Sequence, residues 1–290
     1  MFDFRYHALS LAAVFIALVV GLLLGVAIGD KELVSSAKND LRDSLRRDVI
    51  KANGERDDAR SSLREQQEFI ERSYPILTGG ELRGRHIGLV MLGEDDDAPK
   101  LVDEALEPTG GELDVVTVVR SNPDPSKLAE AAGGTRYEAL ARENDLFDDF
   151  GRRVGVQMVE GGKLIGAVRK DLLRSKSGAF GALDGVVVMR SADKPEDEQA
   201  AKRLDELQKG IVDGLVSTGV TVVGIETRDR EPSQVSWYRD REMSSVDNID
   251  EAAGRAALVF VLAGADGAFG RKDGVPLLPP VVGRGRAGGP

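Results

Sequence analysis

The chain begins with a long apolar stretch, Ala8–Gly29, in which Ser10 is the only polar side chain and no residue is charged. A helix rises about 1.5 Å per residue, so these 22 residues are long enough to span the roughly 30 Å hydrocarbon core of a bilayer. The rest of the chain is too polar to enter lipid. The sequence therefore predicts an N-terminal transmembrane anchor over residues 1–29, followed by a soluble part.

A cleaved signal peptide is the alternative to this anchor. Arg5 supplies some of the positive charge that precedes a signal sequence, and Ala27-Ile28-Gly29 resembles a poor cleavage site. The apolar run is longer than the ~7–15 residues of an ordinary signal sequence. We therefore favour the uncleaved anchor.

The charges that flank the anchor leave its orientation open. More Lys and Arg residues follow the helix than precede it, which by the positive-inside rule favours a cytoplasmic C-terminus. A long downstream domain can cross the membrane whatever its flanking charges, however, so the rule decides little here.

One face of the anchor carries small residues at every fourth position. Gly21, Gly25 and Gly29 form this row, and Ala13 and Ala17 extend it. Such spacing lets two helix backbones approach closely in lipid, although glycine is also frequent in transmembrane helices generally. We interpret the row as a helix-packing face and predict a homo-oligomer.

Residues 30–73 predict a helical stalk. The segment contains no proline and many charges of both signs, which suits a solvated helix with i,i+4 pairs. Its apolar positions, mostly four residues apart, predict a coiled-coil seam that includes Leu33, Leu41, Leu45 and Leu63. The alternative is a single helix lying on its own domain. Tyr74-Pro75 is expected to end the helix, because the residue before proline avoids the helical region.

Residues 80–264 predict an α/β domain with a mostly parallel, doubly wound sheet. Near-continuous Val, Ile and Leu runs are typical of strands that are covered on both faces. The predicted strands are His86–Leu92, Asp114–Val119, Gly185–Met189, Val220–Ile225 and Ala256–Leu262. The predicted helices are Pro99–Leu106, Tyr137–Met158 and Pro195–Ser217.

The sequence also supports predictions for three further segments. Residues 244–251 read as a short helix capped by Asp247 or Asn248. The polar loop with Ser236-Trp237-Tyr238 is either a contact surface or folds back onto the domain. Residues 265–290, rich in Gly, Pro and Arg, predict a disordered tail.

The densest acidic cluster, Asp95, Asp96 and Asp97, is the candidate metal site. It follows the first predicted strand, and ligands of open α/β sheets bind outside the carboxyl ends of strands. Carboxylates there could hold Mg²⁺ or Ca²⁺. We favour the simpler interpretation, in which Asp96 or Asp97 caps the helix that begins near Pro99.

Composition excludes several function classes. A net charge of −10 opposes binding to nucleic acid, and the absence of cysteine excludes disulfides and thiolate chemistry. The only histidines are His7 and His86, and the five methionines are scattered, which argues against a dedicated copper site within one protomer. The chain has no phosphate-binding glycine motif and no nucleophile elbow. We therefore expect neither a cofactor nor an enzyme.

Several stretches together resemble the actinobacterial copper transporter family typified by the mycobacterial copper transport protein B. They are Met1-Phe2-Asp3-Phe4-Arg5-Tyr6-His7, Gly178-Ala179-Phe180 with Leu183–Val187, and Ser244–Asn248 with Ala253–Leu258. The resemblance implies a membrane protein with an extracytoplasmic domain and a role in copper homeostasis. Corynebacterial relatives act in cell separation, which implies a second membrane protein as partner. The resemblance transfers no catalytic or metal-ligating residue.

These observations predict a single-pass membrane protein with a role in copper efflux or homeostasis at the cell envelope. The first alternative is a non-enzymatic oligomeric scaffold that recruits a partner in cell separation or envelope maintenance. The second is an α/β enzyme or nucleotide-binding domain with its site near Asp95.

Overall fold

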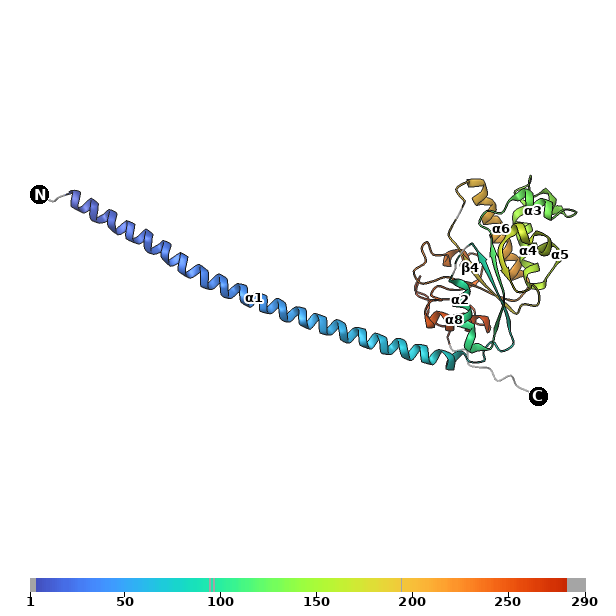
Figure 1. Ribbon diagram of the computed structural model, residues 1–290, viewed down its shortest axis with the longest axis horizontal. Helices are drawn as coiled ribbons and strands as arrows, with labels where there is room; N and C mark the ends of the chain where they lie inside the picture. The colour runs from blue at the N-terminus through green and yellow to red at the C-terminus, as the bar shows by residue number, and fades with distance from the viewer. Residues whose placement is uncertain (1–3, 94, 96, 194, 281–290) are drawn as a thin grey trace. The chain divides into compact units, whose positions relative to one another are not determined.

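A computed structural model describes residues 4–93, 95, 97–193 and 195–280; for residues 4, 28–34 and 37 it describes only the backbone. The chain divides into two compact units, residues 1–68 and 69–290. Helix α1 (Phe4–Thr78) supplies the first unit and the start of the second (Figure 1).

The N-terminal unit contains the candidate membrane span. Arg5–Ala27 is long and apolar enough to cross a bilayer, with a mean hydropathy of 2.8, and none of it is buried. A Cβ atom on Gly21 or Gly25 would meet nothing within 4 Å, so this face of the helix is open. The surroundings of Gly29 lie outside the described residues.

The predicted seam of the stalk is open to solvent within one chain. Leu41, Leu45 and Leu63 are each more than half exposed. The side chain of Leu33 lies outside the described residues. The helical character of the stalk is confirmed, whereas the coiled coil stays a prediction.

The expected end of the helix at Tyr74-Pro75 is wrong, because α1 continues to Thr78 with Pro75 inside it. Tyr74 is buried and its hydroxyl donates to the Ala105 carbonyl, while the buried Thr78 hydroxyl donates to the Tyr74 carbonyl over 2.8 Å. Packing of this last turn against the domain outweighs the cost of proline in a helix.

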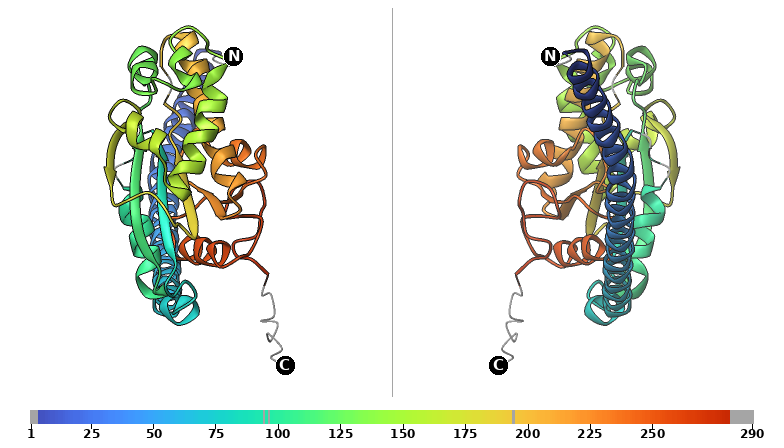
Figure 2. Two further views of the ribbon diagram at one scale, coloured as in Figure 1. Left: turned by 90° about the vertical axis from the view of Figure 1, so that its right-hand side faces the viewer. Right: turned by 90° about the vertical axis from the view of Figure 1, so that its left-hand side faces the viewer.

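The C-terminal unit contains a seven-stranded sheet in the order β3-β2-β1-β4-β5-β6-β7. β3 is antiparallel to β2, and the other pairings are parallel. Figure 2 shows the green strands of the first half at one end of the sheet and the orange and red C-terminal elements at the other. The strands are β1 (His86–Leu92), β2 (Glu112–Val119), β3 (Leu173–Ser177), β4 (Gly185–Arg190), β5 (Thr221–Ile225), β6 (Ser244–Val246) and β7 (Ala268–Phe269).

Helices cover both faces of this sheet (Figure 1). Leu89 and Val187 pack into a core with α2 (Ala98–Leu106) and α8 (Ala252–Leu262). Their neighbours Val90 and Val188 point the other way, into a core with α4 (Leu146–Glu160) and α6 (Glu198–Ser217). The remaining helices are α3 (Pro125–Ala131), α5 (Lys163–Leu172) and α7 (Val235–Arg239), with 3₁₀ turns at Glu107–Thr109 and Arg136–Ala139.

Glycines bring α4 and α6 into backbone contact. A Cβ atom on Gly155 of α4 would lie 2.1 Å from the Ile211 carbonyl oxygen, and one on Gly214 of α6 would lie 2.1 Å from that of Arg152. Gly151 and Gly210 have equally close backbone neighbours on the facing helix. Residues without a Cβ are therefore required along this crossing.

The mixed α/β class with a mostly parallel sheet is confirmed, but one predicted strand is wrong. Ala256–Leu262 forms most of α8, because a short apolar run cannot by itself separate a buried helix from a buried strand. Residues 244–251 are not a helix either: β6 occupies Ser244–Val246, and Glu251 takes the N-cap position of α8.

Two boundaries and the tail also differ from expectation. The predicted helix Tyr137–Met158 is a 3₁₀ turn followed by α4, and α6 begins at Glu198, where the Asp197 carboxylate accepts from the Ala200 amide over 2.7 Å. The disorder predicted for residues 265–290 is wrong up to residue 280, because β7 joins the sheet. Residues 281–290 lie outside the described part.

Candidate functional site

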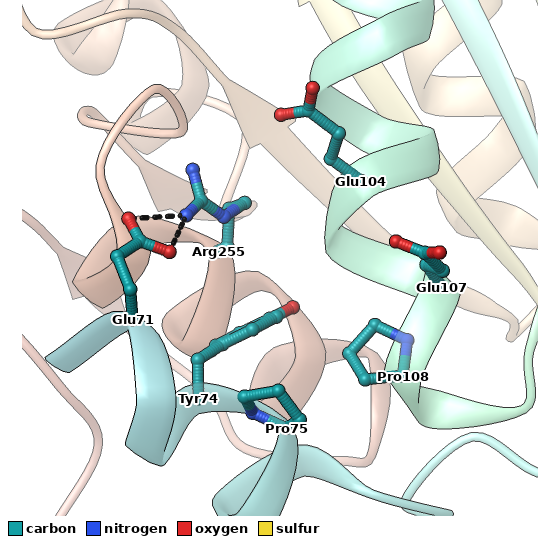
Figure 3. Close-up of a pocket in the computed structure, with 7 residues that line it drawn as sticks. All are labelled: Glu71, Tyr74, Pro75, Glu104, Glu107, Pro108 and Arg255. Atoms are coloured by element: carbon teal, nitrogen blue, oxygen red, sulfur yellow. Dashed lines mark hydrogen bonds and ion pairs between the residues drawn. The ribbon is translucent and has the colours of Figure 1, made fainter. Parts of the chain in front are cut away.

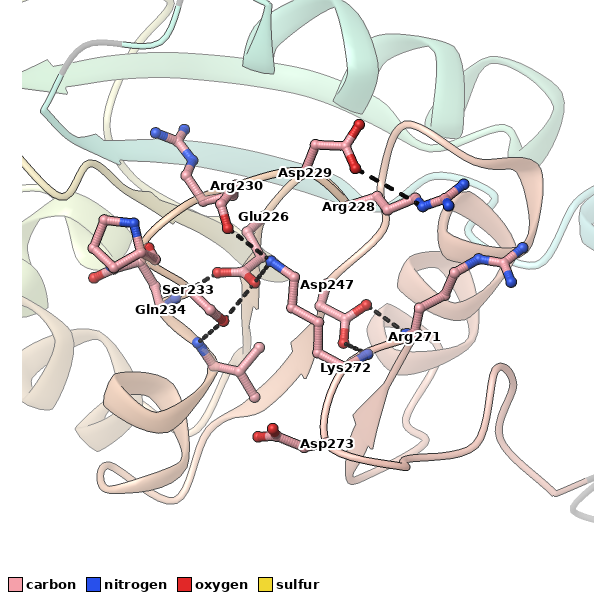
Figure 4. Close-up of polar contacts among 12 residues, drawn as sticks. Glu226, Arg228, Asp229, Arg230, Ser233, Gln234, Asp247, Arg271, Lys272 and Asp273 are labelled. Atoms are coloured by element: carbon pink, nitrogen blue, oxygen red, sulfur yellow. Dashed lines mark hydrogen bonds and ion pairs between the residues drawn. The ribbon is translucent and has the colours of Figure 1, made fainter.

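The carboxyl ends of the parallel strands carry buried acidic side chains. Glu226 directly follows β5, Asp247 directly follows β6, and each is only 1% exposed. Ligands of α/β sheets bind at this edge, so its side chains decide whether the domain has such a site. Figure 4 shows them together with the residues that contact them.

The Glu226 carboxylate is fully engaged by its own chain. It lies 2.7 Å from the Lys272 ammonium group, accepts from the Ser233 hydroxyl over 2.7 Å, and accepts from the Gln234 amide. Lys272 also donates to the Arg230 carbonyl over 3.0 Å. The charge of this buried acid is therefore compensated without a ligand.

Asp247 is engaged in the same way by residues 270–273, which we term the C-terminal strap. Its carboxylate accepts from the Arg271 and Lys272 amides over 2.6 and 2.8 Å. Gly270 has φ of 142°, and a Cβ atom there would lie 1.9 Å from the Asp247 carboxylate. Only glycine lets the strap come this close to β6.

Glu251 ties the strap to the start of α8. Burial alone would raise the pKa of this carboxyl, but hydrogen bonds from Arg271, Asn248 and Arg228 lower it overall. The Arg271 guanidinium donates to it over 2.6 Å. A third acid near this edge is thus held ionised by donors of the same chain.

Within the predicted acidic cluster, Asp95 acts as a helix cap. One oxygen accepts from the Asp97 and Ala98 amides, each over 3.2 Å, and the other pairs with Arg230. Asp97 occupies the N-cap position of α2, but its side chain makes no capping hydrogen bond. Asp96 lies outside the described residues. A carboxylate so occupied is a poor cation ligand, and the metal site at this cluster stays a prediction.

Arg190, which the sequence analysis missed, is buried at the end of β4. Its guanidinium donates to Gln208 over 2.8 Å and to Asp205 over 3.1 Å, and it also donates to Gln234. Burial lowers the pKa of this group. The signal available in the sequence was one arginine at the end of an apolar strand.

The aromatic pair Trp237-Tyr238 lies in α7 rather than in a loop, and it packs onto the domain. The guanidinium carbons of Arg190 and Arg241 lie over the Trp237 ring, 4.6 and 3.6 Å from its centroid. Tyr238 is fully buried, burial raises the pKa of its hydroxyl, and that hydroxyl donates to the Ile225 carbonyl over 3.1 Å. Helix α7 therefore stabilises the strand ends.

A hollow of about 670 Å³ lies elsewhere in the C-terminal unit, beside the end of α1 (Figure 3). Arg255 pairs with Glu71 across it over 2.8 Å, and burial raises the pKa of Tyr74 to about 12. The raised pKa keeps Tyr74 protonated, and its hydroxyl donating to α2, into the alkaline range. The hollow is lined by Glu71, Tyr74, Pro75, Glu104, Glu107, Pro108 and Arg255.

The opposite edge of the sheet holds a group of metal-ligand type. His86, Glu112 and Asp114, at the amino ends of β1 and β2, each place one ligand atom within 4.8 Å of the others. The His86 Nδ1 atom lies 2.7 Å from an Asp114 oxygen. Among the described residues, His86, Glu112 and Asp114 form the group of His, Cys, Asp or Glu side chains whose ligand atoms lie close enough together to hold one metal ion. Composition alone could not reveal it, because the strand pairing creates it.

Comparison with known proteins identifies the family. The family model described as copper transport outer membrane protein, MctB, matches residues 1–280. A search of curated proteins found no match. The family match covers the apolar helix, the stalk and the described part of the α/β unit. It confirms the resemblance to copper transport protein B, and the chain therefore belongs to the MctB family of copper transport outer membrane proteins.

Proposed function

We propose that this copper transport-related membrane protein acts in copper efflux or homeostasis at the cell envelope, as a single-pass protein. The main support for this proposal is that one family model spans both the apolar helix and the α/β unit. The word "outer" in the family description favours an extracytoplasmic position for the C-terminal unit.

We further propose that the α/β unit is not an enzyme. Glu226, Asp247 and Asp95, the acids that follow three parallel strands, are each bonded to donors of the same chain. The strap lies at the edge where a nucleotide or substrate would bind in other α/β proteins. The strand order, with helices on both faces, supports the doubly wound interpretation.

Two exposed features of α1 support the second candidate function, an oligomeric scaffold. The open glycine face at Gly21 and Gly25 and the exposed seam at Leu41, Leu45 and Leu63 lie on one helix. Both features suit contact with other helices, either of a second copy or of a second membrane protein in cell separation. Such a scaffold would recruit a partner to the envelope and need not move copper itself.

The test is the copper content of cells that lack the protein. A deletion strain grown with added copper is expected to accumulate the metal, and the full-length chain is expected to reverse this. A chain lacking residues 30–72 serves as the second complementation arm. Reversal by both chains supports a copper role that is independent of the stalk. Unchanged cellular copper contradicts that role and favours the scaffold, which septation phenotypes would then test.

A further inference from the structure

We propose that His86, Glu112 and Asp114 form a Cu(II)-binding site, which we term the amino-end triad. This inference rests on the proposed function and deepens it, because it names the residues at which the chain would bind copper. The triad lies at the amino ends of the strands. The metal site that the sequence predicts, at Asp95, Asp96 and Asp97, follows the carboxyl end of β1.

Strand pairing brings the three side chains together. His86 of β1 lies opposite Glu112 of β2, and the register of the two strands then shifts between Ile87 and Gly88, which leaves Asp114 as an extra residue. Such a bulge re-aims a side chain. The Asp114 carboxylate comes within 2.7 Å of the His86 ring, and the three ligand atoms lie within 4.8 Å of one another.

The His86 backbone is held in place independently. Its amide donates to an Asp184 carboxylate oxygen over 2.8 Å, and the Asp184 amide donates to the His86 carbonyl over 2.8 Å. These two bonds fix the start of β1 to the residue just before β4. The imidazole therefore extends from a rigid strand end, as a preorganised ligand requires.

The spacing fits a small transition-metal ion. Two ligands at right angles and ~2.0 Å from one ion lie about 2.8 Å apart, close to the His86–Asp114 separation. Glu112 is exposed, and its carboxylate lies within 4.8 Å of the other two ligand atoms. The His86 and Asp114 side chains are 48% and 34% exposed, so water has access to the remaining coordination positions.

The ligand types select the oxidation state. One imidazole with carboxylates suits Cu(II), whereas Cu(I) prefers cysteine and methionine sulfur, and the chain has no cysteine. Cu(II) also binds such N/O sites more tightly than the other divalent first-row metals. The contrast with Asp95 is informative: Arg230 neutralises Asp95, while Asp114 is paired with an imidazole that is itself a metal ligand.

The test uses the full-length protein in detergent, purified with a tag free of histidine and titrated with Cu(II) alone. We expect one bound equivalent, with a paramagnetic resonance spectrum that shows nitrogen coupling from an imidazole. His86→Gln is expected to weaken binding at least tenfold and to remove that coupling. Glu112→Gln, a change at an exposed position, is expected to weaken binding and to keep the coupling.

His7→Gln is the matched control, because it removes the other histidine and leaves the triad intact. Unchanged affinity and nitrogen coupling in correctly folded His86→Gln protein would overturn the proposal, as would loss of binding in His7→Gln alone. Failure of this site is distinguishable from failure of the proposed function. A deletion strain with normal copper contradicts the function, whereas His86→Gln protein that binds Cu(II) normally contradicts only the site.

Discussion

Glu226 is nearly inaccessible to water, and the Lys272 ammonium group compensates its negative charge. The two residues are far apart in the sequence, so the buried acid depends on a distant segment of the chain. Removing one partner of a buried pair leaves an uncompensated charge, which costs far more than the intact pair contributes.

Lys272→Met is therefore expected to lower the free energy of unfolding by about 3 kcal/mol. Denaturant unfolding of the detergent-solubilised protein, followed by the fluorescence of Trp237, measures the loss. The double variant Glu226→Gln/Lys272→Met removes the stranded charge and is expected to recover more than half of it. A loss below about 0.5 kcal/mol, the level of an ordinary surface substitution, would show that the pair is not coupled to folding.

At the scale of elements, the crossing of α4 and α6 depends on four glycines. The spacing of Gly151 with Gly155 and of Gly210 with Gly214 places small residues one turn apart on both helices. The two backbones approach so closely that any side chain on this face meets a carbonyl group. Relief of such a clash requires the two helices to move apart, which would open the core beneath them.

Gly155→Ala is expected to destabilise the protein by about 3 kcal/mol, because the new methyl group would overlap the Ile211 carbonyl. Gly166→Ala in α5 is the matched control, since a Cβ atom there meets nothing within 4 Å. It is expected to stabilise by about 0.5–1 kcal/mol through helix propensity alone. Thermal unfolding of both variants gives the comparison, and equal effects would refute the close-packing account.

Local patterns of apolar residues in the sequence are enough to predict most of the strands and helices. The runs at His86–Leu92 and Gly185–Met189 predict β1 and β4 because strands covered on both faces need continuous apolar residues. The same signal fails at Ala256–Leu262, where a helix is buried just as completely. The antiparallel β3, Leu173–Ser177, is mostly polar at an edge and has no comparable signal.

The site features depend on long-range pairing, which local patterns do not contain. His86 and Glu112 become neighbours only when β1 and β2 align, and the bulge at Asp114 has no sequence marker. The glycines and prolines around Lys272 predict a disordered tail. Its buried partner, Glu226, shows why the segment is ordered.

At the scale of the whole molecule, α1 carries both an open small-residue face and an exposed apolar seam. Gly25→Leu adds bulk to the open face of the anchor, where close backbone approach is required for association in lipid. We expect this change to reduce cross-linked oligomers in native membranes about tenfold. Gly54→Ala, at an open position of the same helix, is the control and is expected to leave them unchanged. Undiminished oligomers in Gly25→Leu would rule out this packing face.

The late position of the strap has a consequence for biosynthesis. The ribosome makes β1 to β6 before the strap, so during synthesis Glu226 lacks the Lys272 ammonium group and Asp247 lacks the Arg271 and Lys272 amides. A product that stops before residue 270 would lack these later partners, and we expect its domain to be less stable and more readily degraded by cellular proteases. The stability of the domain is therefore expected to depend on a segment that is translated after strands β1 to β6.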